Sequence, residues 1–307
     1  MLNWQVTFHS IVVSLILVAT SSTNAFAWGK RGHSIVCETA ANLAAANEAK
    51  TMFLALHSFD LGFYCNVPDL VWKKPATYQQ EKNNHFMDLE IFDRALGAKA
   101  KEAFSLDRHA FDKAHPDVKE EAGRAYWRVA ELEVKLGRLA DALKKGIEDQ
   151  EKRHKAQVDW LVVAGAIGHY VGDLSQPLHV TENYDGQLTD QKGIHSFYEE
   201  AVVDELTRSP SPSGLAADVG RAAAKSWSDY QKRVAKFATL DILQDLARTS
   251  IAEMPKLLAT DRKVGRTNLA KAASAYREQI VTRLATGAMA LAEIWKRETG
   301  MEFDEKK

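Results

Sequence analysis

The segment GHYVGDLSQPLH (Gly168–His179) contains two histidines, an aspartate and a proline in an otherwise mostly apolar stretch. His169 and Asp173 are four residues apart, so on a helix their side chains project from one face, one turn apart. Pro177 cannot continue the hydrogen-bonded ladder of a helix, so the chain should bend there and bring His179 towards the same side. The segment therefore predicts part of a metal site carried by a helix.

Helical periodicity extends through most of the chain. Apolar residues spaced three and four apart in alanine-rich windows predict helices over Gly32–Leu56, Val118–Lys145, Val158–Tyr170, Ile194–Leu206, Leu215–Ala238 and Asn268–Arg297. Alternation of β-branched residues is nearly absent, and no internal repeat is found. Turn-forming residues predict loops at Gly62–Gln80, Asn183–Gly193 and Arg208–Gly214. We therefore expect a single all-α domain.

The first 27 residues predict a signal peptide. The apolar run Ile11–Thr20 is too short for a stable membrane anchor, and AFA at residues 25–27 matches the A-x-A cleavage pattern. The segment before the apolar run lacks lysine and arginine, and the alternative is an uncleaved N-terminal anchor. We expect cleavage after Ala27, export to the periplasm or beyond, and a domain comprising residues 28–307.

The overall charge does not demand an anionic partner. Forty Lys and Arg residues face 41 Asp and Glu residues, a formal net charge of −1. This balance counts against a protein that binds duplex nucleic acid tightly through its basic surface, but not against an enzyme that holds its substrate through metal ions. No apolar run after the leader is long enough to span a membrane, and we expect a monomer.

The two cysteines are Cys37 and Cys65. In an exported protein an even pair predicts a disulfide, and the alternative is two buried free thiols. Two cysteines are too few for a cysteine-ligated zinc site. Any metal must therefore be held by imidazole and carboxylate groups.

Further groups that could bind a metal lie outside the opening segment. GIHSFYEE places His195 and Glu199 four residues apart on one helical face, although such a pair is often only a surface ion pair. NNHFMDLE supplies His85, and Asp69 lies in the proline-containing loop before it.

The start of the mature chain, WGKRGH, adds a different kind of ligand. Cleavage after Ala27 would free the α-amino group of Trp28, which can chelate a metal together with the carbonyl of the same residue. His33 follows five residues later. Four segments thus supply candidates for about three zinc ions with positions left open for water or substrate. The nine candidates are Trp28, His33, Asp69, His85, His169, Asp173, His179, His195 and Glu199.

From Trp28 to the last predicted helix, the chain resembles the superfamily that joins zinc-dependent phospholipase C with the single-strand-preferring zinc nucleases of the S1/P1 family. The motifs WGKRGH, NHFMD, HYVGDLSQPLH and IHSFYE carry the resemblance. It implies a compact multi-helix domain with a trinuclear zinc site in a cleft. In that superfamily a mature N-terminal Trp is itself a ligand, in agreement with the predicted cleavage site.

The resemblance also implies how the ligands are shared among three zinc ions. The first ion would be held by Asp69, His85, His169 and Asp173. Asp173 would bridge to the second ion, which the amine and carbonyl of Trp28 and the side chain of His33 would also hold. The third would be held by His179, His195 and Glu199.

Two features of the chain depart from the nuclease pattern. Glu199 stands where the nucleases usually have Asp, and the phospholipases use Glu at this position. The interval from His179 to His195 is also short and lacks the Gly-Gly-Asn loop expected of nucleases. Both features leave a phospholipase C acting on phosphatidylcholine-type lipids as the alternative function.

Other features favour a nuclease. The short interval between Trp28 and His33 is the nuclease pattern. HFMD resembles the nuclease base pocket, in which Phe86 would stack on a base and Asp88 would accept a hydrogen bond from the base edge. We therefore expect an exported endonuclease, a hydrolase that cleaves single-stranded DNA or RNA.

The expected chemistry is phosphodiester hydrolysis. Zinc lowers the pKa of bound water to roughly 7, so the two ions bridged by Asp173 would hold a hydroxide that Asp69 orients or deprotonates, while the third ion stabilises the leaving oxygen. Lys73 could contact phosphate, as could the adjacent Lys74, or both could be ordinary solvated residues. Trp72 stands where such nucleases tend to have a basic residue. A non-catalytic helical protein that binds adventitious zinc is a further alternative, but it leaves Trp28 unexplained.

Overall fold

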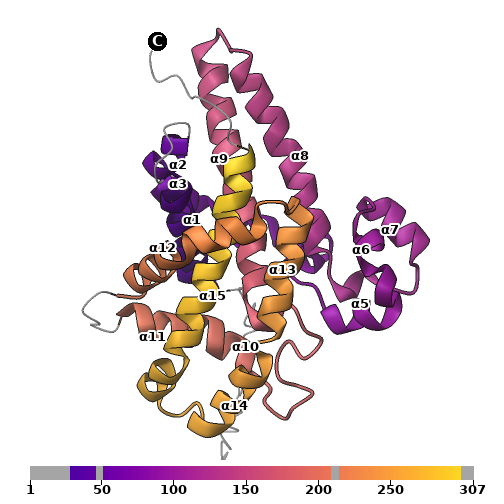
Figure 1. Ribbon diagram of the computed structural model, residues 1–307, viewed down its shortest axis with the longest axis vertical. Coiled ribbons are helices and arrows are strands. Elements are labelled where there is room, and N and C mark those ends of the chain that lie inside the picture. The colour runs from indigo at the N-terminus through magenta and orange to yellow at the C-terminus, as the bar shows by residue number, and fades with distance from the viewer. Residues whose placement is uncertain (1–27, 46–50, 209–213, 299–307) are drawn as a thin grey trace, which may run out of the picture.

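The computed structural model describes residues 28–45, 51–208 and 214–298. The predicted signal peptide and most of the predicted Arg208–Gly214 loop lie outside the described residues. The described part is all-α, as predicted, and forms one compact domain (Figure 1). Extended pairing in these ranges is limited to an isolated bridge between Met87 and Gly123.

The helical elements differ in length from single turns to 30 residues. In chain order they are α1 (Gly29–Ala45), α2 (Met52–Leu56), α3 (Ser58–Tyr64), η2 (Pro68–Trp72), α4 (Tyr78–Glu81), η3 (Lys82–His85), α5 (Leu89–Leu96), η4 (Gly97–Lys99), α6 (Ala100–Phe104), α7 (Arg108–Ala114), η5 (Glu120–Ala122), α8 (Ala125–Lys144), α9 (Gln150–Ser175), η6 (Pro177–His179), α10 (Ile194–Ser196), η7 (Phe197–Val202), α11 (Val203–Arg208), α12 (Gly214–Val234), α13 (Thr239–Ile251), α14 (Met254–Val264) and α15 (Leu269–Glu298).

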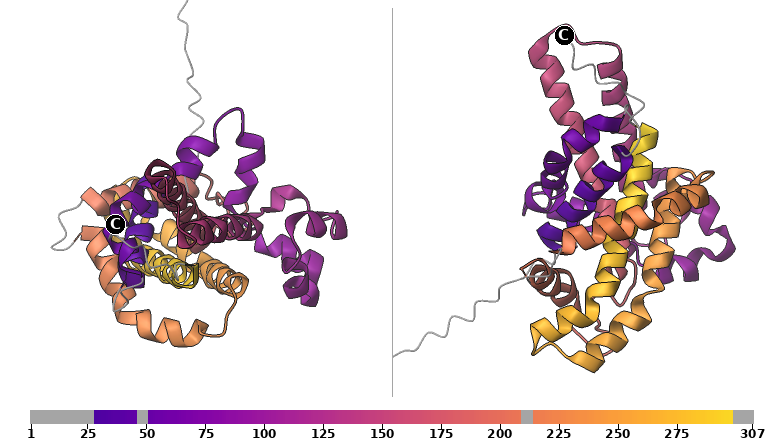
Figure 2. Two further views of the ribbon diagram at one scale, coloured as in Figure 1. Left: turned by 90° about the horizontal axis from the view of Figure 1, so that it is seen from above. Right: turned by 60° about the vertical axis from the view of Figure 1, so that its left-hand side comes forward.

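Helix α9 is the centre of the domain. It begins where the Asp149 side chain accepts a hydrogen bond from the backbone amide of Lys152, which caps the helix. Its residues are buried without exception from Val163 to Ser175. It packs against α1, α3, α8, α13 and α15, so its C-terminal half is buried around the whole circumference rather than along one stripe. Figure 1 and Figure 2 show α8 and α9 as a long antiparallel pair, with α5, α6 and α7 as a lobe to one side.

Two glycines let other segments approach α9 closely. A Cβ atom at Gly168 would lie 2.2 Å from the sulfur of Cys37, and a Cβ atom at Gly172 would lie 2.9 Å from Nδ1 of His33. Larger residues would therefore push α1 away from α9. These glycines, one on each side of His169, determine how close α1 comes to the candidate metal ligands.

Helix α9 ends at Ser175, and the chain restarts as the single turn Pro177–His179, which confirms the predicted break. The side chain of Gln176 accepts a hydrogen bond from the amide of Leu178 and so caps the new turn. Arg283 on α15 donates to the carbonyl of Ser175 at 2.9 Å. These two contacts fix the chain just before and just after the break.

The predicted Gly62–Gln80 loop is partly wrong. Helix α3 continues to Tyr64, Pro68 opens the π-helical turn η2, and α4 starts at Tyr78. Proline is compatible with the first turn of a helix because the amides there have no intrahelical partner. The predicted turn-rich segment Asn183–Gly193 is confirmed.

The sequence also missed several helices. The short helices α5, α6 and α7 bury Phe92, Phe104 and Phe111, whose rings meet one another and Trp127 of α8. Helices α13 and α14 were not predicted either. In contrast, the prediction of Val158–Tyr170 was too short, since α9 spans Gln150–Ser175 and carries both His169 and Asp173.

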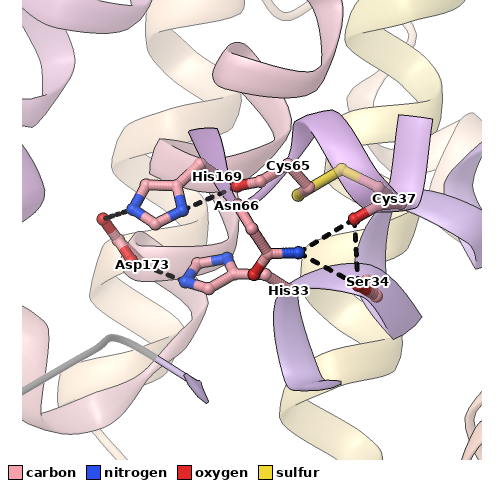
Figure 3. Close-up of a disulfide and its surroundings, with 8 residues drawn as sticks. His33, Ser34, Cys37, Cys65, Asn66, His169 and Asp173 are labelled. Atoms are coloured by element: carbon pink, nitrogen blue, oxygen red, sulfur yellow. Dashed lines mark hydrogen bonds and ion pairs between the residues drawn. A yellow bond between two sulfur atoms is a disulfide. The ribbon is translucent and has the colours of Figure 1, made fainter. Parts of the chain in front are cut away.

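Cys37 on α1 and Cys65 after α3 form a disulfide, which confirms the predicted pairing (Figure 3). The next residue, Asn66, donates hydrogen bonds to the hydroxyl of Ser34 and the carbonyl of Gly62. The disulfide and these hydrogen bonds hold the chain that leads to η2 against α1.

We expect the double substitution Cys37→Ser/Cys65→Ser to lower the free energy of unfolding by about 2–4 kcal/mol, because the bridge closes a loop across a sequence separation of 28 residues and restricts the unfolded chain. Urea unfolding of the metal-free protein measures the change. Two titratable thiols in the unfolded, unreduced native protein would contradict the bridge, as would equal stability of the variant.

Candidate metal centre

Asp173 lies at the centre of the first group of candidate ligands. Its Oδ1 is 3.3 Å from Nε2 of His33 on α1. Its Oδ2 is 3.1 Å from Nδ1 of His85 and 3.5 Å from Nε2 of His169. The two oxygens of one buried carboxylate therefore face different histidines, which suits a ligand that bridges two ions; His33 and His169 flank Asp173 in Figure 3.

Asp69 approaches the same group from η2. Its Oδ1 is 3.8 Å from Nδ1 of His85, and its Oδ2 is 3.8 Å from Nε2 of His169. The facing nitrogens of His85 and His169 are 3.0 Å apart. His169 thus belongs to two overlapping sets of ligand-type atoms, one with His33 and Asp173 and one with Asp69 and His85.

A third group of ligand-type atoms forms after the break in α9. Nε2 of His179 is 3.5 Å from Oε2 of Glu199, and Nε2 of His195 is 2.9 Å from the same oxygen. The two imidazole nitrogens lie 3.0 Å apart. Gln176 donates a hydrogen bond to this carboxylate oxygen at 3.1 Å. All eight side chains that the sequence nominated as ligands therefore fall into three groups.

In three histidines, the ring nitrogen that points away from the candidate metal groups lies next to a backbone carbonyl, and this contact determines the tautomer. Nδ1 of His169 is 2.8 Å from the carbonyl oxygen of Cys65, Nδ1 of His179 is 2.7 Å from that of His85, and Nδ1 of His195 is 2.8 Å from that of Tyr184. A carbonyl can only accept, so each Nδ1 carries the proton, and Nε2 of the neutral ring presents a lone pair. In each of the three groups of candidate ligands, atoms that carry lone pairs therefore lie about 3 Å from one another.

Such an arrangement suits a bound cation. Uncompensated lone pairs and carboxylates in a buried site repel one another, whereas a divalent ion would turn the same contacts into coordination bonds. Oδ1 of Asp173 and Oε1 of Glu199 are buried without a hydrogen-bond partner from residues 28–45, 51–208 or 214–298. The donor set consists of imidazole nitrogens and carboxylate oxygens. The residues present therefore fit metal ions at these three groups.

The electrostatics of the site point the same way. Burial, together with nearby positive groups, lowers the pKa of His85 and His169 well below 6.5, which keeps both rings neutral and able to bind a metal. Burial raises the pKa of Asp173 well above 3.8, so its charged form requires a compensating cation. At the third group the metal-free protein instead favours an ion pair: burial opposes both charges, but Glu199 raises the pKa of His195, and His195 and His179 lower the pKa of Glu199 to about 2. A cation bound there would take the place of the proton on His195.

Trp28 is fully buried at the start of α1. Its indole nitrogen donates to the carbonyl of Gly172 at 2.9 Å and to the hydroxyl of Ser175 at 2.8 Å, on either side of Asp173 in the sequence. The indole ring packs against Tyr198. Its carbonyl accepts a hydrogen bond from the amide of Gly32. The side chain thus fixes residue 28 against the part of α9 that carries the central carboxylate.

A comparison with models of protein families identifies the family of this chain. The model of the S1/P1 nucleases matches residues 28–298. The chain belongs to the S1/P1 nuclease family. A comparison with curated proteins gave no match. Membership implies a hydrolytic phosphodiesterase that acts on nucleic acid, and the three groups of His, Asp and Glu are candidate metal sites of that enzyme. None of the described helices combines the length and apolar character needed to cross a membrane.

The residues predicted to contact the substrate of this S1/P1 nuclease differ in how deeply they are buried and in which groups they contact. Lys73 is mostly buried, and its Nζ lies 3.4 Å from Oδ1 of Asp69. Lys74 is exposed. Phe86 is partly buried beside Gly123, where a Cβ atom would collide with the carbonyl of Phe86. The structure therefore distinguishes the two lysines and brings only Lys73 next to a candidate ligand.

Asp88, the other residue of the nominated base pocket, is buried at the start of α5. Burial, together with the nearby carboxylates of Glu90 and Glu182, raises the pKa of Asp88 to about 8. The unfolded chain releases this proton near pH 3.8, whereas the folded chain keeps it to about pH 8. Stability contributed by the protonated group is therefore lost as pH rises through this window.

We accordingly expect Asp88→Asn to stabilise the metal-free S1/P1 nuclease relative to the wild type by an amount that grows from pH 4 to pH 8, because the amide carries no charge to bury. Urea unfolding of both proteins in chelator across this range measures the difference. A difference in stability that does not change with pH would show that Asp88 ionises normally in the folded protein.

The sequence did not nominate several residues that surround the S1/P1 site. Gln176 contacts Glu199, and its only sequence signal was a polar side chain within the opening segment. Arg128 of α8 places its guanidinium 5.1 Å from the centre of the Trp72 ring. Glu81 accepts hydrogen bonds from Arg128 and Tyr170. No residue spacing links α8 to these positions, because only the tertiary fold joins them.

Proposed function

We propose that this S1/P1 nuclease is an exported endonuclease that hydrolyses single-stranded DNA or RNA with three zinc ions. The observation that carries the proposal is the position of Asp173, whose two oxygens face histidines of two overlapping groups. A phosphodiester is anionic and repels nucleophiles, so its hydrolysis requires positive charge close to the attacking and leaving oxygens. Clustered metal sites meet this requirement in many phosphodiesterases.

Zinc is the proposed metal because the candidate ligands are imidazoles and carboxylates, with three or four for each ion. We expect elemental analysis of the exported protein to find close to three zinc ions per chain, since three groups of ligands are present. The protein for this measurement must be purified without a chelator. One ion or none in intact protein would contradict the trinuclear site.

Zinc bound at these groups would neutralise phosphate charge and lower the pKa of a water molecule to about 7. Within this site, Asp69 is the residue placed to orient that water or take its proton, because it faces His85 and His169 from a separate segment. Asp173 holds the two overlapping groups together. Lys73 adds a positive charge beside Asp69, where it can contact the phosphate.

A preference for single strands follows from the proposed base contact. Phe86 would stack on an unpaired base, and Asp88 would meet the edge of that base. Stacking on an aromatic side chain is worth roughly 1–3 kcal/mol per base. Bases in a duplex have their faces covered by their neighbours. An unpaired strand would therefore bind better without any sequence code.

A phospholipase C is the second candidate. Glu199 replaces the Asp that the nucleases usually have, and Leu70 and Val71, which directly follow Asp69, are 38% and 50% exposed. Exposed apolar side chains beside a metal site would suit the acyl chains of a lipid better than a nucleotide. The family membership favours nucleic acid over lipid.

Export rests on the predicted signal peptide cleaved after Ala27, which would leave the mature protein in the periplasm or outside the cell. Two observations support it. The Cys37–Cys65 bridge suits an oxidising compartment, and the family match begins at Trp28.

The test of the proposed function is a parallel assay of the mature protein on denatured DNA, single-stranded RNA and phosphatidylcholine vesicles, each with and without chelator. We expect acid-soluble nucleotides from both nucleic acids, their loss in chelator and their recovery with added zinc. Release of phosphocholine without nucleotide products would favour the phospholipase. Nucleic acid cleavage that persists after zinc has been removed would contradict the metal-dependent mechanism.

A further inference from the structure

His85 differs from the other candidate ligands in the orientation of its ring. His169, His179 and His195 turn Nδ1 to a backbone carbonyl and Nε2 to the metal groups. His85 does the reverse, because its Nδ1 faces Asp173 at 3.1 Å. The outward nitrogen of His85 is therefore Nε2, and among the described residues no carbonyl accepts its proton.

The outward nitrogen needs an acceptor. When Nδ1 of His85 donates its lone pair to a metal, Nε2 must carry the proton. Nε2 is buried and has no hydrogen-bond partner within bonding distance in the part of the chain that the structure describes. Oε1 of Glu81 lies 3.9 Å away, four residues earlier in the chain and on the same side of the α4–η3 segment. Glu81 is the carboxylate placed to accept this proton.

Glu81 is itself held by three side chains. The hydroxyl of Tyr170 on α9 donates to Oε1, while Arg128 and Asn84 donate to Oε2 at 3.2 and 3.3 Å. Glu81 is 6% exposed, so these contacts fix the orientation of its carboxylate and compensate its burial. Arg128 is in turn packed between the rings of Trp72 and Tyr170.

We propose that Glu81 is a positioning residue for the metal centre: it receives Nε2–H of His85 and so keeps the Nδ1 lone pair directed at the ion shared with Asp69, His169 and Asp173. Outer carboxylates of this kind orient metal-binding imidazoles and raise their basicity. His85 also contacts the third group through its backbone, because its carbonyl accepts the proton of His179 Nδ1. The inference rests on the metal-binding part of the proposed function.

The competing explanation is that Glu81 only neutralises Arg128. The two explanations separate in a pair of variants, Glu81→Gln and Glu81→Gln/Arg128→Met. If Glu81 positions His85, both variants lose zinc affinity, since neither restores a carboxylate behind the imidazole. If Glu81 merely balances the arginine, the second substitution removes the uncompensated charge and restores zinc binding.

The matched control is Asp112→Asn. Asp112 also pairs with an arginine, the buried Arg124, at 2.8 Å, and neither belongs to the three groups of candidate ligands. The variant therefore reports the effect of removing a carboxylate from a buried arginine elsewhere in the domain. Thermal unfolding of each metal-free protein shows whether a variant still folds.

The measurement is a zinc competition titration of the mature protein with a chromophoric chelator. We expect Glu81→Gln and the double variant to bind one zinc about 10–100-fold more weakly than the wild type, with Asp112→Asn unchanged. Wild-type affinity in Glu81→Gln, or its recovery in the double variant, would overturn the proposal. The titration uses no substrate. A wild type that binds zinc but cleaves no nucleic acid would therefore contradict the proposed function without contradicting this inference.

Discussion

Asp173→Asn is expected to abolish phosphodiesterase activity, with a loss of at least about 10³-fold in kcat/KM. The two oxygens of the wild-type carboxylate face different histidines, His33 on one side and His85 and His169 on the other. An amide keeps one oxygen and replaces the other with an NH₂ group that cannot bind a cation. Two neighbouring sites are damaged at once, and several kcal/mol of transition-state stabilisation correspond to such a factor.

The control for this prediction is the variant His195→Ala. His195 belongs to one group only, so its removal should weaken one ion and leave the pair of groups around Asp173 in place. We expect a smaller loss of activity and the loss of about one zinc ion. Elemental analysis and kcat/KM of both variants, measured side by side, give the order of the two effects.

Stability separates a lost ligand from a lost fold. Burial raises the pKa of Asp173 well above 3.8, so the charged carboxylate destabilises the metal-free protein as pH rises towards neutrality. A neutral amide removes this contribution. The metal-free Asp173→Asn protein should therefore be at least as stable as the metal-free wild type at pH 7. Full zinc content and activity in this variant would show that Asp173 does not bridge.

The ligand types could be predicted from the sequence because helix spacing is a local property. His169 and Asp173 share a face of α9, and His195 and Glu199 share a face across α10 and η7, as their four-residue spacing indicates. Their grouping with residues of distant segments depends on tertiary packing. Gly168 lets α1 approach α9 closely, and no spacing rule reveals that contact.

The parts of the fold that were missed depend on packing in the same way. Helices as short as α7 are unstable in isolation, so their sequence signal is weak, and it is burial of Phe111 against Trp127 that holds α7 in place. Glu81 illustrates the limit for the site. A glutamate four residues before a histidine is common on exposed helices, and its contacts with Tyr170 and Arg128 arise only in the folded domain.

The second large effect concerns the N-terminus. A chain that begins with Met directly before Trp28, with that Met retained, is expected to lose about one zinc ion and at least about 10²-fold in kcat/KM. The free α-amine of Trp28 is the nominated ligand, and an additional residue converts this nitrogen into an amide. An amide nitrogen is a far poorer ligand, because its lone pair is delocalised into the carbonyl.

The fold gives the extra residue little freedom to move aside. The indole of Trp28 is buried and donates to Gly172 and Ser175, so residue 28 keeps its place whether or not the amine is free. The decisive comparison uses one protein fused before Trp28 to a domain that a specific protease removes without leaving a residue. We expect the fusion to bind less zinc and cleave poorly, and cleavage at Trp28 followed by zinc addition to restore both. Wild-type activity with an additional residue, verified by mass spectrometry, would remove the Trp28 amine from the site and leave the three groups of side chains as the whole metal centre.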